Sequence, residues 1–161
     1  MIRHARAADH PAIAEVNELA FGGTDEARLI ERLRADGDVL FELVAVEDGA
    51  VTGHILFSRL FADRSELFAA LAPMAVRPGL QRAGTGSALV RAALDNAKEF
   101  GAHGVLVLGH IDYYPRFGFL AETAANVSSP YSGSPAFMAI ALEKGAFDQP
   151  LSVAYPDAFS G

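Results

Sequence analysis

The hydrophobic positions near the start of the chain indicate a short strand followed by two helices. Residues 2–6 are typical of a short strand. Apolar residues then recur at helical spacing, at Ile13, Val16 and Ala20. Phe21-Gly22-Gly23 ends this helix, and Thr24 is placed to cap a second one that stops before Gly37. We therefore expect two helices that meet at a glycine-rich turn.

Three runs rich in β-forming residues follow, at 41–47, 51–61 and 67–76. Asp48-Gly49, between the first two runs, is a strong hairpin signal. Pro73 lies inside the third run and has no N–H to donate to a neighbouring strand. We therefore expect a bulge or a splay of the sheet at this position.

The second half of the chain returns to the helical repeat and then to strands. After the glycine-bearing segment 77–86, a helix is expected with the apolar stripe Leu89, Ala93, Ala97 and Phe100, closed by Gly101. Residues 105–108 are wholly apolar, as in a strand buried on both faces, which favours a parallel crossover. A single helical turn at 112–117, capped by Asp112, precedes a strand at 137–142. The resulting order is β-α-α-β-β-β-α-β, then a helical turn and a strand.

Length and composition narrow the class of protein. The chain has 161 residues, no cysteine and a formal charge of −7, which fits one domain over 1–161. Without cysteine, disulfides, thiolate nucleophiles and cysteine-based metal sites are excluded. The negative charge argues against broad binding to nucleic acid or anionic membranes, and no apolar run approaches the roughly 18 residues of a spanning helix. We expect a cytoplasmic protein with neither kind of partner.

The segment 77–86 has the properties of an anion site. It joins a strand to the start of a helix, where unpaired N–H groups and the helix dipole favour negative charge, and Gly84 and Gly86 would let a phosphate approach the main chain. No lysine follows the last glycine, as a triphosphate loop needs, and Ser87-Ala88-Leu89 lacks the third glycine of a dinucleotide loop. Residues 67–120 nevertheless carry five basic and three acidic side chains in an otherwise acidic chain.

Two segments resemble those of the GCN5-related N-acetyltransferase (GNAT) family. Gln81-Arg82-Ala83-Gly84-Thr85-Gly86, after Met74-Ala75-Val76-Arg77-Pro78, is similar to that family's acetyl-CoA loop, Q/R-x-x-G-x-G/A. Tyr113-Tyr114-Pro115-Arg116-Phe117-Gly118-Phe119 resembles the later family motif, and with residues 51–58 it is similar to a branch of predicted acetyltransferases. The resemblance covers nearly the whole chain. It implies an α/β fold with a mixed, mostly antiparallel central sheet flanked by helices, splayed between its fourth and fifth strands.

The resemblance also implies acetyl-CoA as co-substrate and assigns its contacts. Backbone amides of the loop, with added charge from Arg82, would hold the pyrophosphate; the loop residues are Gln81, Arg82, Ala83, Gly84, Thr85, Gly86 and Ser87. The strand residues Met74, Ala75 and Val76 would lie along the pantetheine arm. Met74 and Val76 would hydrogen-bond its amides as though the arm were an added strand.

Two catalytic groups are implied in the same way. The backbone N–H of Met74 would stabilise negative charge that develops on the thioester oxygen. Tyr114, four residues before Gly118, would protonate the departing CoA thiolate, a role worth about 10² to 10⁴ in rate. Tyr113 is expected to pack. In the alternative interpretation both tyrosines only fill the core.

No residue is an obvious base for the acceptor amine. His54 is a candidate, because a symmetric hairpin would place it opposite Pro73 or Met74, beside the reacting centre. A one-residue slip would turn it to the other face, and a hydrogen-bonded structural histidine is the commoner role. His110 and Asp112 are weaker candidates. The five histidines show no metal-ligand spacing, and we expect no metal.

Asp25 and Glu26 follow the glycine-rich turn and could bind a cationic acceptor, because the family builds its acceptor wall from the first helix pair. Acidic residues in the first turn of a helix more often only complement the helix dipole. The sequence leaves both roles open.

The prediction is an N-acetyltransferase that moves an acetyl group from acetyl-CoA to a primary amine of a small molecule or peptide, by direct attack on the thioester. Two alternatives stay open: a non-catalytic regulatory domain that binds CoA or acyl-CoA, and a phosphate-binding module without CoA. A homodimer is an expectation of the family alone.

Overall fold

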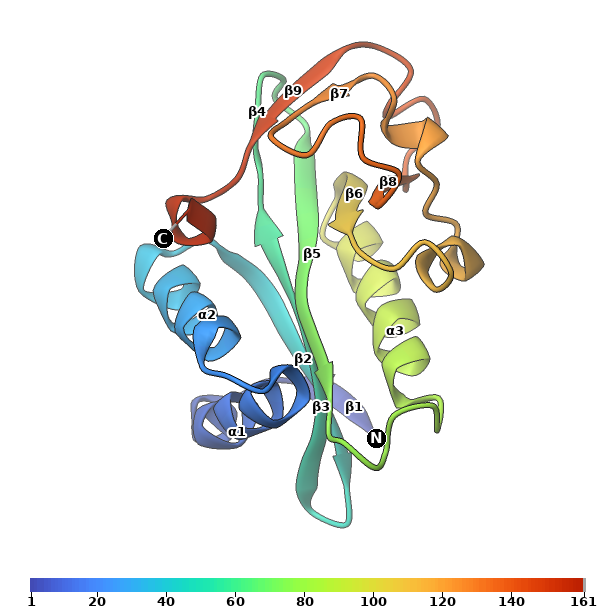
Figure 1. Ribbon diagram of the computed structural model, residues 1–161. Coiled ribbons are helices and arrows are strands. Elements are labelled where there is room, and N and C mark those ends of the chain that lie inside the picture. Colours follow the sequence, from blue (N-terminus) through green and yellow to red (C-terminus); the bar gives the residue numbers. More distant parts are fainter. Residues whose placement is uncertain (161) are drawn as a thin grey trace.

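A six-stranded sheet runs through the middle of the computed structural model, which describes residues 1–160 (Figure 1). Its strands lie in the order β1-β2-β3-β5-β6-β8. Their bounds are Ile2–His4, Val39–Glu47, Ala50–Arg59, Leu67–Val76, Ala102–Leu108 and Phe137–Ala141. All neighbouring pairs are antiparallel except β5 and β6. The mixed, mostly antiparallel sheet expected from the sequence is therefore confirmed.

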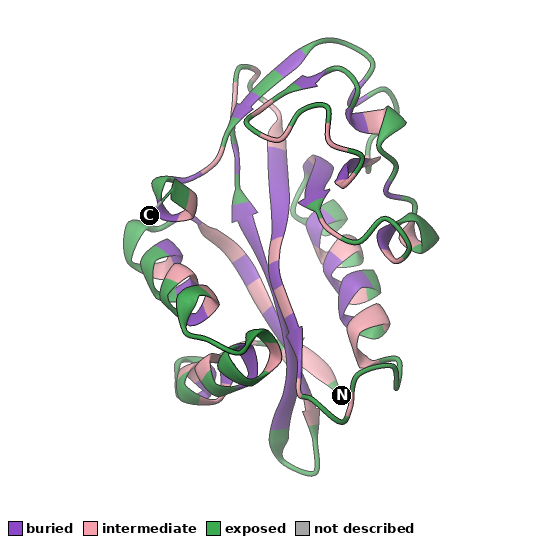
Figure 2. Cartoon of the chain, viewed as in Figure 1, coloured by how far each residue is buried: buried purple, intermediate pink, exposed green. Residues whose placement is uncertain are grey.

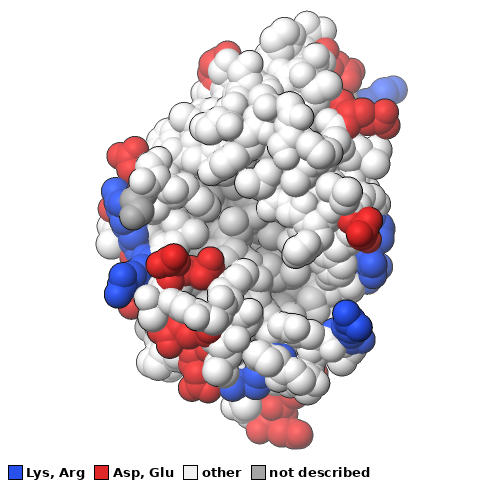
Figure 3. Space-filling model, viewed as in Figure 1, with Lys and Arg blue, Asp and Glu red and all other residues white. Residues whose placement is uncertain are grey.

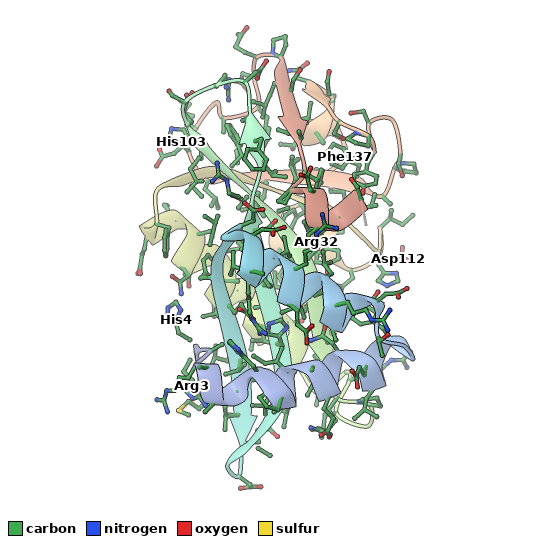
Figure 4. The ribbon with its side chains drawn as sticks, turned by 90° about the vertical axis from the view of Figure 1, so that its left-hand side faces the viewer. Arg3, His4, Arg32, His103, Asp112 and Phe137 are labelled. Atoms are coloured by element: carbon green, nitrogen blue, oxygen red, sulfur yellow. The ribbon has the colours of Figure 1, made fainter. Side chains whose placement is uncertain are left out.

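Helices cover both faces of this sheet. α1 (His10–Phe21) and α2 (Asp25–Asp36) lie on one face, side by side in front of the strands in Figure 4, and α3 (Thr85–Glu99) lies on the other. Alternate residues of each strand feed the two cores. Ile55 and Phe57 pack with α3, whereas Leu56 packs with α1 and α2. Figure 2 shows that burial is concentrated on the sheet and on the helix faces turned toward it.

Glycines end the helices and form the hairpin where the sequence predicts them. Gly22 and Gly37 follow α1 and α2 with φ of 74° and 75°, a left-handed conformation that glycine adopts without steric cost. Asp48 and Gly49 both have positive φ, 50° and 79°, as the tight turn between β2 and β3 requires.

The splay expected near Pro73 lies between β5 and β6. These strands pair in parallel only from Leu67 to Ala70, where Ala70 is opposite Leu106. From there to its end at Val76, β5 has no pairing with β6. On its other side, β5 pairs with β3 through a register shift that leaves Ala72 and Pro73 as a bulge. The sheet therefore opens along the second half of β5.

A second, three-stranded sheet extends the molecule beyond the splay (top of Figure 1). It pairs β4 (Phe61–Ala62), β9 (Leu151–Ala154) and β7 (Val127–Ser128) in the order β4-β9-β7. The sequence predicts one strand over 51–61, but the chain leaves the first sheet at Leu60 and joins the second. Short 3₁₀ turns at Ala7–Asp9, Tyr114–Phe117, Glu122–Ala124 and Asp157–Ser160 complete the elements.

Three further expectations differ from the structure. The turn of the aromatic motif begins at Tyr114, and the residue at its N-cap is Tyr113 rather than Asp112. Phe100 lies after the end of α3 and its side chain is 53% exposed, so the buried stripe of that helix ends at Ala97. The first strand ends at His4 rather than at residue 6, because Arg6 already leads into a 3₁₀ turn.

Candidate active site

A pocket of about 430 Å³ opens where β5 and β6 part. Its walls include residues 70–74 of β5 and Leu106 and Leu108 of β6. Residues from α1 and α2 line one end and the aromatic motif lines another, so the pocket passes through the gap in the sheet. Figure 3 shows a hollow in the middle of this face, surrounded mainly by uncharged side chains.

Tyr114 lies in the wall of this pocket and is 7% exposed. Its ring stands over Gly109, since a Cβ added to Gly109 would lie 2.4 Å from Cε2 of the ring. Glycine is needed there to admit the tyrosine. Burial, with a smaller contribution from Tyr113, raises the pKa of Tyr114 to about 12. The phenol is therefore protonated at neutral pH and can donate a proton or a hydrogen bond.

Tyr113 does more than pack. It lines the pocket, and its hydroxyl lies 3.1 Å from Oγ of Ser87 in the first turn of α3. A Cβ on Gly86 would lie 3.2 Å from the same hydroxyl. The aromatic motif is thereby joined to the glycine-bearing loop, which the sequence places 26 residues earlier.

The free edge of β5 is defined by its hydrogen bonds to β3. The Arg77 N–H donates to the Thr52 carbonyl at 2.8 Å, so the backbone groups of Arg77 point toward β3. In a strand, the N–H and C=O groups of successive residues point to alternate edges. The backbone groups of Ala75 therefore also point toward β3, whereas those of Met74 and Val76 point toward the opened edge. Met74 and Val76 thus lie as expected for strand-like contacts with a ligand. Ala75 is not brought to that edge, contrary to expectation.

The glycine-bearing loop ends on the first turn of α3. Gly84 is the N-cap with φ of 90°, and Arg82 also has a positive φ of 70°. The first N–H groups of a helix have no partner within it and favour an anion. Arg82 forms no ion pair among residues 1–160. The Gln81 side chain donates to the Val76 carbonyl at 3.1 Å, which ties the loop to the edge of β5.

His54 does not lie beside Met74, and this expectation is wrong. Ser58 pairs with Ala70 and Phe57 with Leu71, and a continued register would put His54 opposite Met74. The bulge at Ala72 and Pro73 adds a residue to β5, so His54 pairs with Ala75 instead. Along β3, His54 alternates with Ile55 and shares the face of Leu56, toward α1 and α2, whereas the bulge leaves Met74 on the α3 face.

In that position His54 belongs to a buried polar network. Its side chain is completely buried, with Nδ1 3.2 Å from the Asn17 amide nitrogen and Nε2 2.9 Å from Oε1 of Glu42. Arg34 donates to the same carboxylate at 2.7 Å. Burial lowers the pKa of His54 despite the opposing contact with Glu42, so the ring is neutral at neutral pH. The geometry supports a structural histidine rather than a base.

The end of the pocket away from the loop was largely missed by sequence reasoning. Of the two acidic candidates, Glu26 lines the pocket, whereas Asp25 is exposed and outside its lining. His110 lines it too. The remaining wall there comes from aromatic residues near the C-terminus, Tyr131, Tyr155 and Phe159, which no local motif marks.

Within residues 1–160, no group of three or more histidine, aspartate and glutamate side chains is placed to hold a metal ion. No helix in this part of the chain has the length and apolar character needed to cross a membrane.

Comparisons with known proteins agree on one family. Residues 8–119 match the sequence profile of the acetyltransferase (GNAT) family. The chain is 40% identical over 116 residues to the uncharacterized N-acetyltransferase YjhQ of Escherichia coli K12; the match covers 69% of this chain and 64% of YjhQ. It is 37% identical over 120 residues to the uncharacterized N-acetyltransferase YhbS of the same strain, covering 73% and 71%.

Two solved structures are similar to the whole fold. YhbS of Escherichia coli, crystallised in complex with CoA, superimposes with a TM-score of 0.92 at 30% identity, covering 100% of this chain and 92% of YhbS. A GNAT family acetyltransferase of Brucella melitensis, in complex with acetyl-CoA, gives a TM-score of 0.81 at 33% identity, covering 99% and 97%.

Proposed function

The chain belongs to the acetyltransferase (GNAT) family, and we propose that it transfers the acetyl group of acetyl-CoA to a primary amine. The observation that carries this proposal is the gap between β5 and β6. The opened edge of β5 and the buried phenol of Tyr114 line one pocket, and Tyr113 of the same lining contacts Ser87 in the first turn of α3. These are the groups needed to hold a phosphorylated thioester and to assist its cleavage.

The residues present fit acetyl-CoA. Similar chains bind CoA and acetyl-CoA in their crystal structures. In this chain the N–H groups at the start of α3 and the charge of Arg82 would hold the pyrophosphate. The opened edge at Met74 and Val76 would bind the pantetheine amides. When bound, acetyl-CoA supplies the activated acetyl thioester.

The acetyl transfer forms one bond, breaks one bond and moves one proton, and two groups of the pocket would assist it. The neutral amine nitrogen forms the new C–N bond, the C–S bond breaks, and one proton passes from nitrogen to sulfur. The backbone N–H of Met74 would donate to the carbonyl oxygen as negative charge develops there. Tyr114 would donate from its phenol to the departing sulfur.

The high pKa of Tyr114 limits how it acts. A free thiol has a pKa of about 8.5, so complete transfer of a proton from a phenol of pKa about 12 to a thiolate is uphill by about 5 kcal/mol. We therefore assign Tyr114 a hydrogen bond to sulfur that strengthens as the C–S bond breaks. The proton lost from nitrogen goes to the sulfur as the thiol forms, and the phenol keeps its own proton.

Release of free thiol from acetyl-CoA tests the function directly. Because the chain contains no cysteine, a thiol-reactive dye reports only CoA. We expect amine-dependent release, with the acetylated amine detected by mass spectrometry. Tyr114→Phe should lower kcat by about 10² or more while the Kd for CoA, measured by calorimetry, stays within about twofold. Binding of CoA without thiol release from any amine would replace the enzyme by a CoA-binding domain.

A further inference from the structure

The pocket wall away from the glycine-bearing loop is aromatic. Six residues form it: Phe21, Glu26, Leu29, Tyr131, Tyr155 and Phe159. The Tyr131 and Tyr155 rings meet edge to face, with centroids 5.1 Å apart, and Tyr155 meets Phe159 in the same way at 5.4 Å. With Tyr113 and Tyr114, all four tyrosines of the chain line this one pocket.

Among residues 1–160, Glu26 is the one carboxylate in this lining, and none of their lysines or arginines lines the pocket. Its side chain is half-buried and has no hydrogen-bonded or ion-paired partner among the residues that the structure describes. His110 and the four tyrosines are the other ionisable side chains of the pocket lining. A single unpaired negative charge among aromatic rings is complementary to a single positive charge on an apolar group.

We propose that the acceptor is a monocationic primary amine carried on an apolar, aromatic-sized body. This inference rests on the proposed function. Glu26 binds the ammonium form, and the body lies against Tyr131, Tyr155 and Phe159. On entering the reaction the ammonium releases its extra proton to water, and the neutral nitrogen then attacks as described above.

The same wall disfavours two other classes of amine. A second ammonium, as in a diamine, would be taken out of water, and residues 1–160 contribute no second carboxylate to the lining to pair with it. The carboxylate of an amino acid would lie close to Glu26 and be repelled, and no arginine or lysine of the lining could bind it. Selectivity thus follows from what the wall lacks as well as from Glu26.

Three amines isolate these effects. 2-Phenylethylamine carries one charge on an aromatic body, phenylalanine adds a carboxylate to the same body, and 1,4-diaminobutane replaces the body by a second charge. We expect kcat/KM for 2-phenylethylamine to exceed those of the other two by about tenfold or more. A higher kcat/KM for the diamine or the amino acid would overturn the proposal.

Glu26→Gln and Asp25→Asn form a matched pair of variants. Both remove one charge from the first turn of α2, but only Glu26 lines the pocket. Glu26→Gln should raise KM for 2-phenylethylamine about tenfold and narrow its advantage over phenylalanine, while the Kd for CoA is unchanged. Asp25→Asn should change KM less than twofold. Equal effects of the two variants would refute the role of Glu26.

Failure of this inference is distinguishable from failure of the proposed function. If acetyl-CoA binds but no amine in any class yields thiol and acetylated product, the enzyme assignment fails. If thiol release proceeds best with a polar or polycationic amine, the enzyme assignment stands and the assignment of the acceptor class fails.

Discussion

Replacement of Gly109 by alanine should impair catalysis by moving Tyr114 without removing any functional atom. The added Cβ would lie 2.4 Å from Cε2 and 2.8 Å from Cδ2 of the tyrosine ring. Carbon atoms in contact are separated by about 3.5 Å, so the ring must move by about 1 Å. The backbone of Gly109 resists the opposite movement, because its N–H donates to the Ala136 carbonyl at 3.0 Å.

A displacement of this size is expected to reduce kcat by about 10², which corresponds to about 2.7 kcal/mol of activation free energy. The measurement is steady-state thiol release at saturating acetyl-CoA, with the Kd for CoA measured separately. Gly109 does not have a positive φ, so alanine adds no backbone strain and the effect is steric.

Gly104→Ala is the matched control. A Cβ there would also lie 2.4 Å from an aromatic ring, that of Phe147, but neither residue lines the pocket. Both variants should lose stability to urea, and only Gly109→Ala should lose turnover. Addition of Tyr114→Phe to Gly109→Ala should cost little more than Tyr114→Phe alone, because both act through one hydroxyl. A Gly109→Ala protein with wild-type kcat would refute this account of Tyr114.

The remaining predictions concern charge. Glu42→Gln should lower the free energy of unfolding, measured by urea titration, by about 3 kcal/mol, because it removes the carboxylate that pairs with Arg34 and contacts His54. A loss below about 1 kcal/mol would contradict this. Burial opposes the charge of Glu42, but hydrogen bonds from His54 and Arg34 outweigh it and lower its pKa from 4.5 to about 2. The stability from this group is therefore complete above pH 4.5 and is lost as the pH falls toward 2, so the urea midpoint should fall less steeply in Glu42→Gln over that interval. Because the pKa of Tyr114 is raised to about 12, kcat should show no decline centred near pH 10; such a decline, absent in Tyr114→Phe, would contradict its burial.

Local sequence patterns were sufficient to predict the strands and helices that have a clear apolar pattern or end at a glycine. The predicted third run and β5 cover the same residues, 67–76, because the run is apolar on both faces and is bounded by polar residues and Pro78. The ends of α1 and α2 were predicted because only glycine readily takes the left-handed conformation at residues 22 and 37.

What the sequence could not supply depends on contacts between distant segments. β7 and β9 have two and four residues, too few to show a period. They form because β9 pairs with β4 on one side and with β7 on the other, and these segments are distant in the sequence. The aromatic wall of Tyr131, Tyr155 and Phe159 has the same origin. His54 shows the effect of one bulge: a symmetric hairpin would place it opposite Pro73 or Met74, but the extra residue in β5 puts Ala75 there and turns Met74 to the opposite face.

The distribution of charge links the two halves of the site. The start of the α3 dipole and the guanidinium of Arg82 are positive charges at one end, where Gln81 ties the loop to the edge of β5. Arg77, close by, is already paired with Glu15 at 3.0 Å, so Arg82 is the side chain available to an incoming phosphate. Glu26 provides negative charge at the other end, across the gap between β5 and β6. A phosphorylated thioester and a cationic amine would therefore enter from opposite ends, each attracted to its own end, and meet where β6 leaves β5 and where Tyr114 lies. This arrangement requires that reversal of the charge of Arg82 weaken acetyl-CoA binding without changing KM for the amine, whereas Glu26→Gln has the opposite effect.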